Sequence, residues 1–256
     1  MASGDTLVTL HPNNNNAPAW FYVAFTSGAT EPAIGDTLWG DTSNANGVIE
    51  WYSLEGGAWD NTGTGYILLS NHNGTAWSSG ENATANSTAA GDHLTLTALP
   101  VACAATLDVV RSDTMVLDFD ATVNEVALFT CLMPRHYAGG GLTINVGVSS
   151  TTNTGDMSWA LFLKSYTDDT DNLSNVGTDP SALKVFAAPN FNTAFDAASV
   201  AGEIAEETTT FTDGADMDSV AAGEYFHLLI MRDAQDSTND DMAADAELVF
   251  IEIKET

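Results

Sequence analysis

Basic residues are scarce in this sequence of 256 residues: six Lys and Arg stand against 35 Asp and Glu, which gives a formal net charge of −29. Such a chain repels the phosphates of nucleic acids and the anionic surface of a membrane, so we expect direct binding to neither. The acidity is typical of a solvated surface that limits aggregation. The alternative is that the acidic residues bind multivalent cations or a basic partner. The six basic residues are scattered along the chain: Arg111, Arg135, Lys164, Lys184, Arg232 and Lys254.

Cysteine and long apolar runs are also rare. The two cysteines, Cys103 and Cys131, are too few for a disulfide scaffold, and no CxxC motif supports a structural zinc site. Cys131 stands in an apolar run and is interpreted as a small buried hydrophobic residue. No run of about 18 apolar residues occurs, so no transmembrane helix is expected. The first ten residues lack the basic and apolar regions of a secretory signal, and none is expected.

Helix signals are nearly missing as well, whereas short apolar segments separated by Gly, Asn or Asp recur every ten to twenty residues or so. The clearest strand is 142–149, where Leu142, Ile144, Val146 and Val148 alternate with small or polar residues. Eight strands predicted in the second half suit an antiparallel double-sheet jelly roll. They are Met115–Asp120, Glu125–Met133, 142–149, Met157–Ser165, Ala182–Ala187, Glu207–Thr212, Glu224–Arg232 and Ala246–Lys254.

The first hundred residues differ from the rest in composition. Residues 1–18 are interpreted as an N-terminal arm with one strand at Thr6–Leu10, which pairs either with its own chain or with a neighbour. Residues 19–100 hold five of the six tryptophans and are interpreted as a small aromatic-rich β module. Asn82–Asp92 is poor in apolar residues and is interpreted as the linker that leaves the module. Residues 101–256 complete the predicted all-β architecture as a jelly-roll-like sandwich.

Two sets of segments resemble known families. The first set resembles uncharacterised jelly-roll-like virion proteins of tailed phages and environmental viruses, and it consists of 1–14, Val116–Asp120, Pro134–Thr143, Thr210–Glu224, Arg232–Asp233 and Asp245–Ile253. The second set is similar to a short β module that recurs in phage structural proteins, and it consists of Gly35–Glu50, Gly65–Ser70 and Ser79–Glu81. Asn44 and Asn46 stand where that module often has Gly, a mild departure because Asn tolerates left-handed backbone geometry.

The resemblance implies a structural protein of a phage particle, assembled in the host cytoplasm and located in the virion. Within that class we expect a capsid decoration protein, a homotrimer that contacts itself and other virion proteins such as the major capsid protein. Two alternatives stay open: a carbohydrate-binding tail-fibre or adhesin module, and a self-assembling filament or surface-layer subunit.

Signals for catalysis are weak. No Gly-x-Ser-x-Gly elbow and no phosphate-binding Gly-x-x-x-x-Gly-Lys motif occurs, and none of the five histidines stands near a nucleophile motif. His227 lies in a predicted strand, where a role in the sheet is the default interpretation. Pairs of carboxylates are unavoidable among 35 acidic residues, so they do not by themselves indicate glycoside hydrolysis. We therefore expect no enzyme activity.

Calcium is the one cofactor that the sequence suggests. Asp213, Asp216 and Asp218 form the tightest acidic loop, and Gly214 permits a sharp bend, but no segment completes an EF-hand. The alternative is an acidic turn whose side chains accept hydrogen bonds from backbone N–H groups. Trp51, Trp59 and Trp77 are candidates for a sugar-stacking surface, although a small β module also needs aromatic residues for its core.

Overall fold

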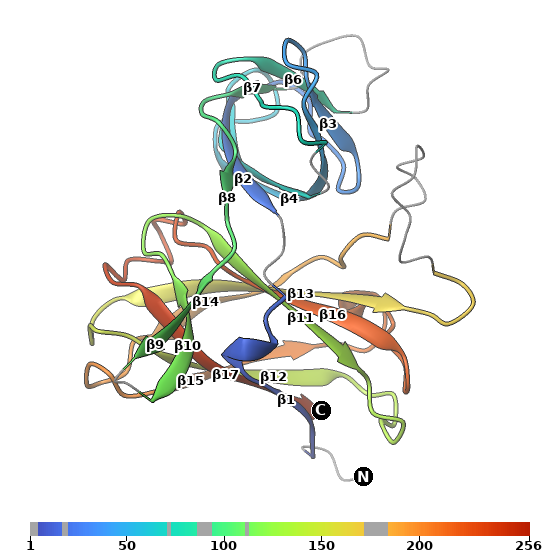
Figure 1. The fold of residues 1–256 in the computed structure, drawn as a ribbon, viewed down its shortest axis with the longest axis vertical. Helices are drawn as coiled ribbons and strands as arrows, with labels where there is room; N and C mark the ends of the chain where they lie inside the picture. Colours follow the sequence, from blue (N-terminus) through green and yellow to red (C-terminus); the bar gives the residue numbers. More distant parts are fainter. Residues whose placement is uncertain (1–4, 17–19, 71–72, 86–93, 111–112, 172–183) are drawn as a thin grey trace. The chain divides into compact units, whose positions relative to one another are not determined.

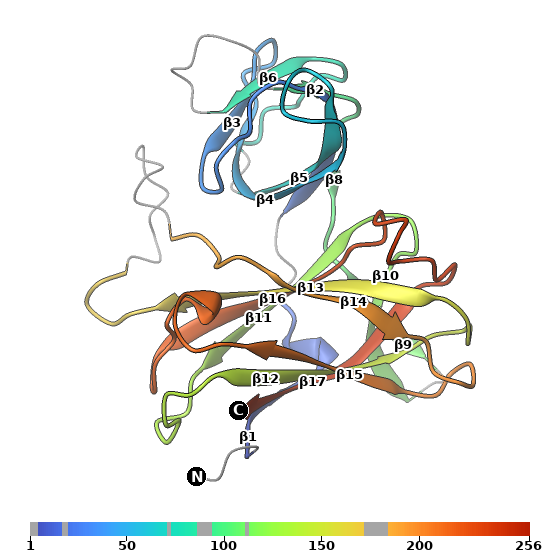
Figure 2. The same cartoon turned by 180° about the vertical axis from the view of Figure 1, so that it is seen from behind.

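The computed structural model describes residues 5–16, 20–70, 73–85, 94–110, 113–171 and 184–256, and it shows an all-β chain that divides into two units (Figures 1 and 2). The first unit is a sandwich formed by residues 1–18, 104–172 and 186–256, and the second is a barrel that includes residues 19–103. No helix among the described residues has the length and apolar character needed to cross a membrane.

The sandwich consists of two antiparallel sheets. The six-stranded sheet has the order β15-β12-β17-β10-β9, with β1 also paired to β17, and the four-stranded sheet has the order β11-β16-β13-β14. Its strands are β1 (Thr6–Leu10), β9 (Thr106–Val110), β10 (Thr114–Phe119), β11 (Glu125–Leu132), β12 (Leu142–Ser149), β13 (Asp156–Tyr166), β14 (Asn190–Asp196), β15 (Ala205–Phe211), β16 (Tyr225–Arg232) and β17 (Ala246–Glu255).

The strand order is that of a jelly roll. Taken in chain order from β10 to β17, the first, third, sixth and eighth strands form one sheet, and the second, fourth, fifth and seventh form the other. This is the arrangement of two Greek keys in a double-sheet sandwich. The predicted antiparallel jelly-roll-like sandwich is confirmed, and seven of its eight predicted strands overlap the strand that occupies that place.

Two local predictions were wrong. The strand predicted at Ala182–Ala187 is not present in the described part of that segment, residues 184–187, and the sheet is completed instead by β14, at Asn190–Asp196. The predicted linker Asn82–Asp92 contains a strand, β6 (Asn82–Ala85), which pairs on both sides. In both segments the apolar content misled the prediction, because pairing with neighbouring strands decided the structure.

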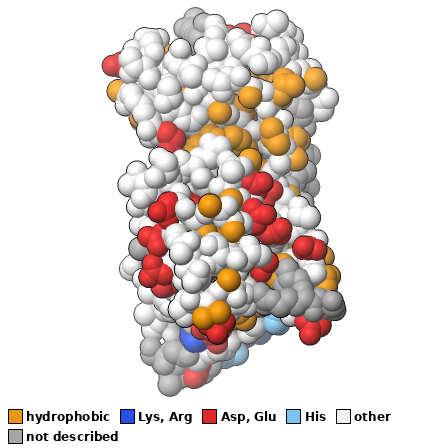
Figure 3. Space-filling view, turned by 90° about the vertical axis from the view of Figure 1, so that its left-hand side faces the viewer, with side chains coloured by type: hydrophobic (Ala, Val, Ile, Leu, Met, Phe, Trp, Pro, Cys, Tyr) orange, Lys and Arg blue, Asp and Glu red, His pale blue; other side chains and the backbone are white. Residues whose placement is uncertain are grey.

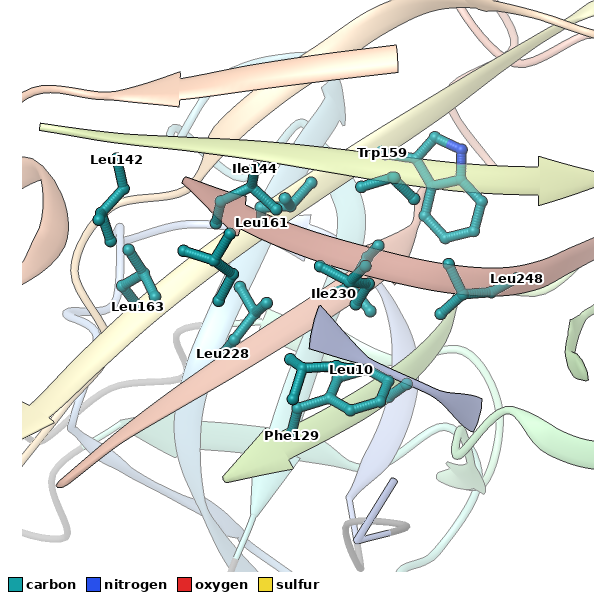
Figure 4. Close-up of a cluster of buried hydrophobic side chains, with 14 of the residues drawn as sticks. Leu10, Phe129, Leu142, Ile144, Trp159, Leu161, Leu163, Leu228, Ile230 and Leu248 are labelled. Atoms are coloured by element: carbon teal, nitrogen blue, oxygen red, sulfur yellow. The ribbon is translucent and has the colours of Figure 1, made fainter. Parts of the chain in front are cut away.

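The core of the sandwich lies between its two sheets (Figure 4). The alternation predicted for β12 holds, since Leu142, Ile144, Val146 and Val148 all point into this core. Trp159 from β13 packs edge-on against Phe119, with ring centroids 4.9 Å apart. Cys131 is buried in the same cluster, as predicted.

The N-terminal arm pairs within its own chain. β1 runs antiparallel to β17, with Leu10 opposite Ile251 and pointing into the core. Beyond the 3-10 turn η1 (Pro12–Asn14), Asn15 forms a bridge with Phe129 in β11, and the Asn16 side chain donates to Thr130 Oγ1 at 2.8 Å. The arm therefore covers part of one edge of each sheet.

The second unit is a closed antiparallel barrel. Six strands form a ring in the order β2-β5-β4-β3-β6-β7, which closes because β7 pairs with β2 and β2 pairs with β5; β8 adds to β2 outside the ring. The strands are β2 (Phe21–Gly28), β3 (Thr37–Gly40), β4 (Asn46–Gly56), β5 (Gly63–Ser70), β6 (Asn82–Ala85), β7 (Leu94–Leu96) and β8 (Val101–Ala102).

Glu81, with the turn that follows β3, has a local structural role. The Glu81 carboxylate accepts hydrogen bonds from the backbone N–H groups of Thr42, Ser43 and Ser78 and from the Ser43 hydroxyl. Although burial acts in the opposite direction, these bonds hold the pKa of Glu81 below its usual value. A Cβ at Gly40 would lie 2.7 Å from that carboxyl group, so the close approach requires glycine. Asn44 adopts a φ of 58°, as its tolerance of left-handed geometry predicted.

Candidate functional site

Acidic side chains gather at one end of the six-stranded sheet. In β10, Asp118 lies directly opposite Glu247 in β17, and in β9, Asp108 lies opposite Val116. Because alternate residues of a strand share a face, and Leu117 points into the core, these three acidic residues share the outer face. Figure 3 shows a side of the molecule where acidic side chains gather over the sandwich and blue Lys or Arg atoms are nearly absent.

Hydrogen bonds join the sheet end to the loop that follows β10. Asp120 Oδ1 accepts from the backbone N–H of Thr122 at 2.6 Å and of Val123 at 3.1 Å. The backbone N–H of Asp120 donates to Glu125 Oε2 at 2.8 Å, and that of Ala121 donates to Asp245 Oδ1 at 3.0 Å. The loop is thus held by carboxylates, which concentrates negative charge there.

The crowding of carboxylates changes their proton affinities. Burial, followed by the charges of Asp245 and Glu247, raises the pKa of Asp118 to about 6. Burial raises the pKa of Glu125 to about 7, and the charges of Asp120 and Asp118 act in the same direction. Glu247 is only 8% exposed, and its Oε2 atom accepts no hydrogen bond from the described residues. This end of the sandwich can take up protons near neutral pH.

One buried cation anchors the same region. Arg232 in β16 is fully buried, and its guanidinium binds Asp240 in a bidentate ion pair with distances of 2.9 and 2.8 Å. It also donates to the backbone oxygens of Phe119, Ala244 and Met242. Every guanidinium nitrogen therefore has a partner, and the side chain ties β10 and β16 to the loop before β17.

A second surface feature lies between β14 and β15, the outermost strands of the two sheets. Here an open cavity of about 550 Å³ has a largely polar lining that includes Asn192, Thr208 and Glu207, and Phe191 is 45% exposed beside it. The Asn190 amide closes part of the gap by donating to Thr210 O at 2.9 Å. This cavity was not predicted from the sequence, because the strand in the place of β14 was predicted several residues too early.

Two of the predicted calcium residues accept hydrogen bonds from backbone N–H groups, one beside their own loop and one in β13. Asp216 Oδ2 accepts from the N–H of Thr212 at 2.7 Å, and Asp218 Oδ2 accepts from the N–H of Ser165 at 2.8 Å. Asp213 is exposed. Within the described ranges no three His, Cys, Asp or Glu side chains are arranged to hold a metal ion. Calcium binding by Asp213, Asp216 and Asp218 stays a prediction.

The three candidate tryptophans do not form one surface. Trp77 is buried in the barrel interior, and Trp51 is buried beside Tyr66, with ring centroids 5.5 Å apart. Trp59 is half-buried and stacks on Phe25 at 5.4 Å. A Cβ at Gly28 would lie 2.8 Å from the Trp59 ring, so the backbone passes directly beneath the indole. The aromatic residues are placed to build the barrel.

His227 lies on the four-stranded sheet, opposite Lys164, and its ring contacts those of Tyr166 and Tyr225. Burial, with a smaller effect from the charge of Lys164, lowers the pKa of His227 to about 4. The imidazole is therefore neutral at physiological pH and acts as an aromatic packing group in this sheet.

Comparison with known proteins gives no family. No family model and no curated protein matches the chain. A solved structure of isomalto-dextranase from Arthrobacter globiformis T6, complexed with panose, is similar over 93% of this chain and 35% of its own length, with 12% identity and a TM-score of 0.30. The chain thus spans about a third of that enzyme. The VP2 subviral particle of infectious bursal disease virus is similar over 100% of this chain and 73% of its own, with 7% identity and a TM-score of 0.25.

Proposed function

We propose that this chain is a structural component of a phage particle, and specifically a capsid decoration protein that stabilises the shell through subunit contacts. The observation that carries the proposal is the order of β10 to β17, which forms the complete jelly roll used by viral capsid domains. A fold alone does not determine a function, so the proposal also draws on the surface of the molecule.

The surface suits a protein that works by contact. The net charge of −29 limits aggregation and disfavours binding to packaged nucleic acid. The interior of the sandwich is filled by hydrophobic side chains, which favours a rigid body over a catalytic pocket. We propose accordingly that the chain is not an enzyme, and that it binds copies of itself, as a homotrimer, and other virion proteins.

Immunogold electron microscopy of particles from the source material tests this function. Antibodies against the purified protein should label the outer surface of the heads, and native mass spectrometry should show a trimer. Labelling restricted to tail fibres would replace decoration with the adhesin alternative. A monomeric protein that labels no particle would contradict a virion role, and open polymers of the purified protein would favour the filament alternative.

A second function, carbohydrate binding, is favoured by the cavity between β14 and β15. Its volume lies in the range of small-ligand sites, and amides, hydroxyls and the carboxylate of Glu207 stand beside an exposed aromatic ring.

A glycan array with wild-type protein and with Phe191→Ala tests carbohydrate binding, and Val200→Ala is the control because Val200 is also exposed. Loss of signal only in Phe191→Ala would support this function, whereas silence across all glycans would exclude it. Repeating the array with a chelator tests the calcium prediction.

A further inference from the structure

The strand β9 leaves one sheet edge of the sandwich open. It pairs with β10 on one side, and no described strand pairs with its other side. By contrast, the outer edge of β11 is partly covered by two segments, since Asn16 N donates to Leu128 O and Ala105 N donates to Val126 O. An uncovered edge presents unpaired backbone groups and is a template for another strand.

One backbone donor of this edge strand is bound by a side chain. The Val109 N–H donates to the Asp108 side chain at 2.6 Å. Such a local bond between adjacent residues is easily exchanged for a bond to an incoming carbonyl group. Val109 therefore marks the position where an added strand would receive a main-chain hydrogen bond.

The inner face of this edge is apolar. Leu107 and Val109 in β9 and Met115 in β10 are 48%, 53% and 40% exposed. Leu107 lies opposite Leu117, which is fully buried, and Val109 lies opposite Met115. These three side chains continue the core of the sandwich beyond its covered part. A strand added beside β9 would bury them with apolar residues of its own.

The outer face of the same edge is acidic. Asp108 and Asp118 lie on it, with Glu247 beside Asp118 on the next strand. Arg232, the cation whose charge reaches Asp120, is already bound by Asp240. The negative charge of this face is thus available to a cation from outside.

We propose that the free edge of β9 binds an extended segment of another protein in which apolar residues alternate with Lys or Arg. Because side chains of a strand alternate between faces, the apolar residues would cover Leu107, Val109 and Met115 while the basic residues would face Asp108 and Asp118. A second copy of this chain fits poorly, since it has six Lys and Arg among 256 residues and its own β9 would set Asp108 against acidic neighbours. This inference rests on the proposed decoration function in one respect: it names the chemistry of the partner that such a protein would bind.

Fluorescence anisotropy with two labelled eight-residue peptides tests the edge without any particle. In one peptide Val alternates with Lys, and in the other Val alternates with Glu. The Lys peptide should bind at least about tenfold more tightly than the Glu peptide, and its affinity should fall several-fold between 50 and 200 mM salt. Equal affinities for the two peptides would overturn the proposal.

Two variants locate the binding. Val109→Pro removes the Val109 N–H and should abolish binding. Asp108→Asn preserves the size of the side chain and should weaken the Lys peptide several-fold while leaving the Glu peptide unweakened. Val200→Pro is the control, because Val200 is exposed in a loop of the same sandwich. Hydrogen–deuterium exchange confirms that each variant remains folded.

The outcomes distinguish a failure of the strand-addition proposal from a failure of the proposed decoration function. Full peptide binding by folded Val109→Pro would overturn the strand-addition proposal even if the wild-type protein decorates particles. Dimers of the wild-type protein at neutral pH that Val109→Pro abolishes would overturn it in favour of a second copy. Peptide binding with the expected pattern, together with no particle labelling, would support the edge and contradict the decoration role.

Discussion

The barrel and the sandwich differ in whether their outer strands are paired with one another. Both are antiparallel and both bury an apolar core, yet the barrel joins its first strand to its last, whereas the sandwich ends in outer strands. Closure pairs the backbone of each barrel strand on both sides, and this removes the edges at which other chains attach. The sandwich keeps β9 open and leaves a cavity between β14 and β15.

The two units also differ in charge. In the sandwich, burial and then the charges of neighbouring carboxylates raise the pKa values of Asp118 and Glu125. In the barrel, the buried Glu81 is satisfied by four donors, and its pKa is lowered. The open strand edge and the carboxyl groups with raised pKa values therefore both belong to the sandwich.

The largest effect is expected from Arg232→Met, which leaves Asp240 buried without its cation. Breaking a buried pair in this way costs about 3 to 5 kcal/mol. Hydrogen–deuterium exchange should show loss of protection in the sandwich while the barrel strands stay protected. The double variant Arg232→Met/Asp240→Leu should recover part of the loss, because no unpaired charge remains. Simultaneous loss of protection in the barrel would contradict the expectation that the barrel stays folded when the sandwich opens.

The matching change in the barrel is Leu69→Ala. Leu69 is fully buried in the barrel interior, and the cavity left by its truncation should destabilise that unit by about 3 kcal/mol. Urea unfolding followed by hydrogen exchange should show protection lost in β2, β4 and β5 first. Leu99→Ala is the control, since Leu99 is exposed and its loss should change little. Equal effects of the two substitutions would show that the barrel lacks a tight core.

A smaller effect is expected in the pH dependence of the stability of the sandwich. Because the pKa of Asp118 is raised in the folded state, its stabilising contribution is complete below pH 4 and is lost as the pH rises through about 6. Asp118→Asn should therefore stabilise the sandwich at pH 7 to 8, by about 1 kcal/mol after allowance for solvent screening. Denaturant midpoints between pH 4 and 8 measure this, and a variant whose midpoints parallel those of wild type would contradict it.

The smallest effect is expected at the covered edge of β11. Asn16→Ala removes the hydrogen bond to Thr130 at an exposed position, which costs about 0.5 kcal/mol. Exchange should quicken locally at residues 128–130 without a change in the global unfolding midpoint. Asn13→Ala, on the exposed η1 turn, is the matched control. A global loss of stability would mean that the arm contributes more than a cover for one edge.

Period-two alternation predicted strands well where one face is buried. In β12, apolar residues alternate with small or polar ones, and the strand was predicted with its observed limits. In β14, Asn190–Asp196, the sequence Asn-Phe-Asn-Thr-Ala-Phe-Asp has only two large apolar side chains, and the more apolar 182–187 was preferred. An outer strand contributes fewer side chains to the core, so its pattern is weaker.

The site features depended more on tertiary contacts. Asp118 and Asp120 share a strand face in the sequence pattern, but the burial of Glu247 beside Asp118 follows from the pairing of β10 with β17, which lie far apart in the sequence. The tryptophans were ambiguous for the same reason. An aromatic side chain in a core and one that stacks on a sugar have the same sequence pattern. Only the closure of the barrel strands places Trp77 inside.

By itself, the sequence determined the all-β class, the succession of strands and the strongly acidic character, because turn residues, alternation and charge act locally along the chain. Only the tertiary structure decided which strand edges are covered, which carboxyl groups share a face, and that the aromatic module closes into a barrel. These properties depend on pairs of segments distant in sequence, whose register follows from the burial of both cores together.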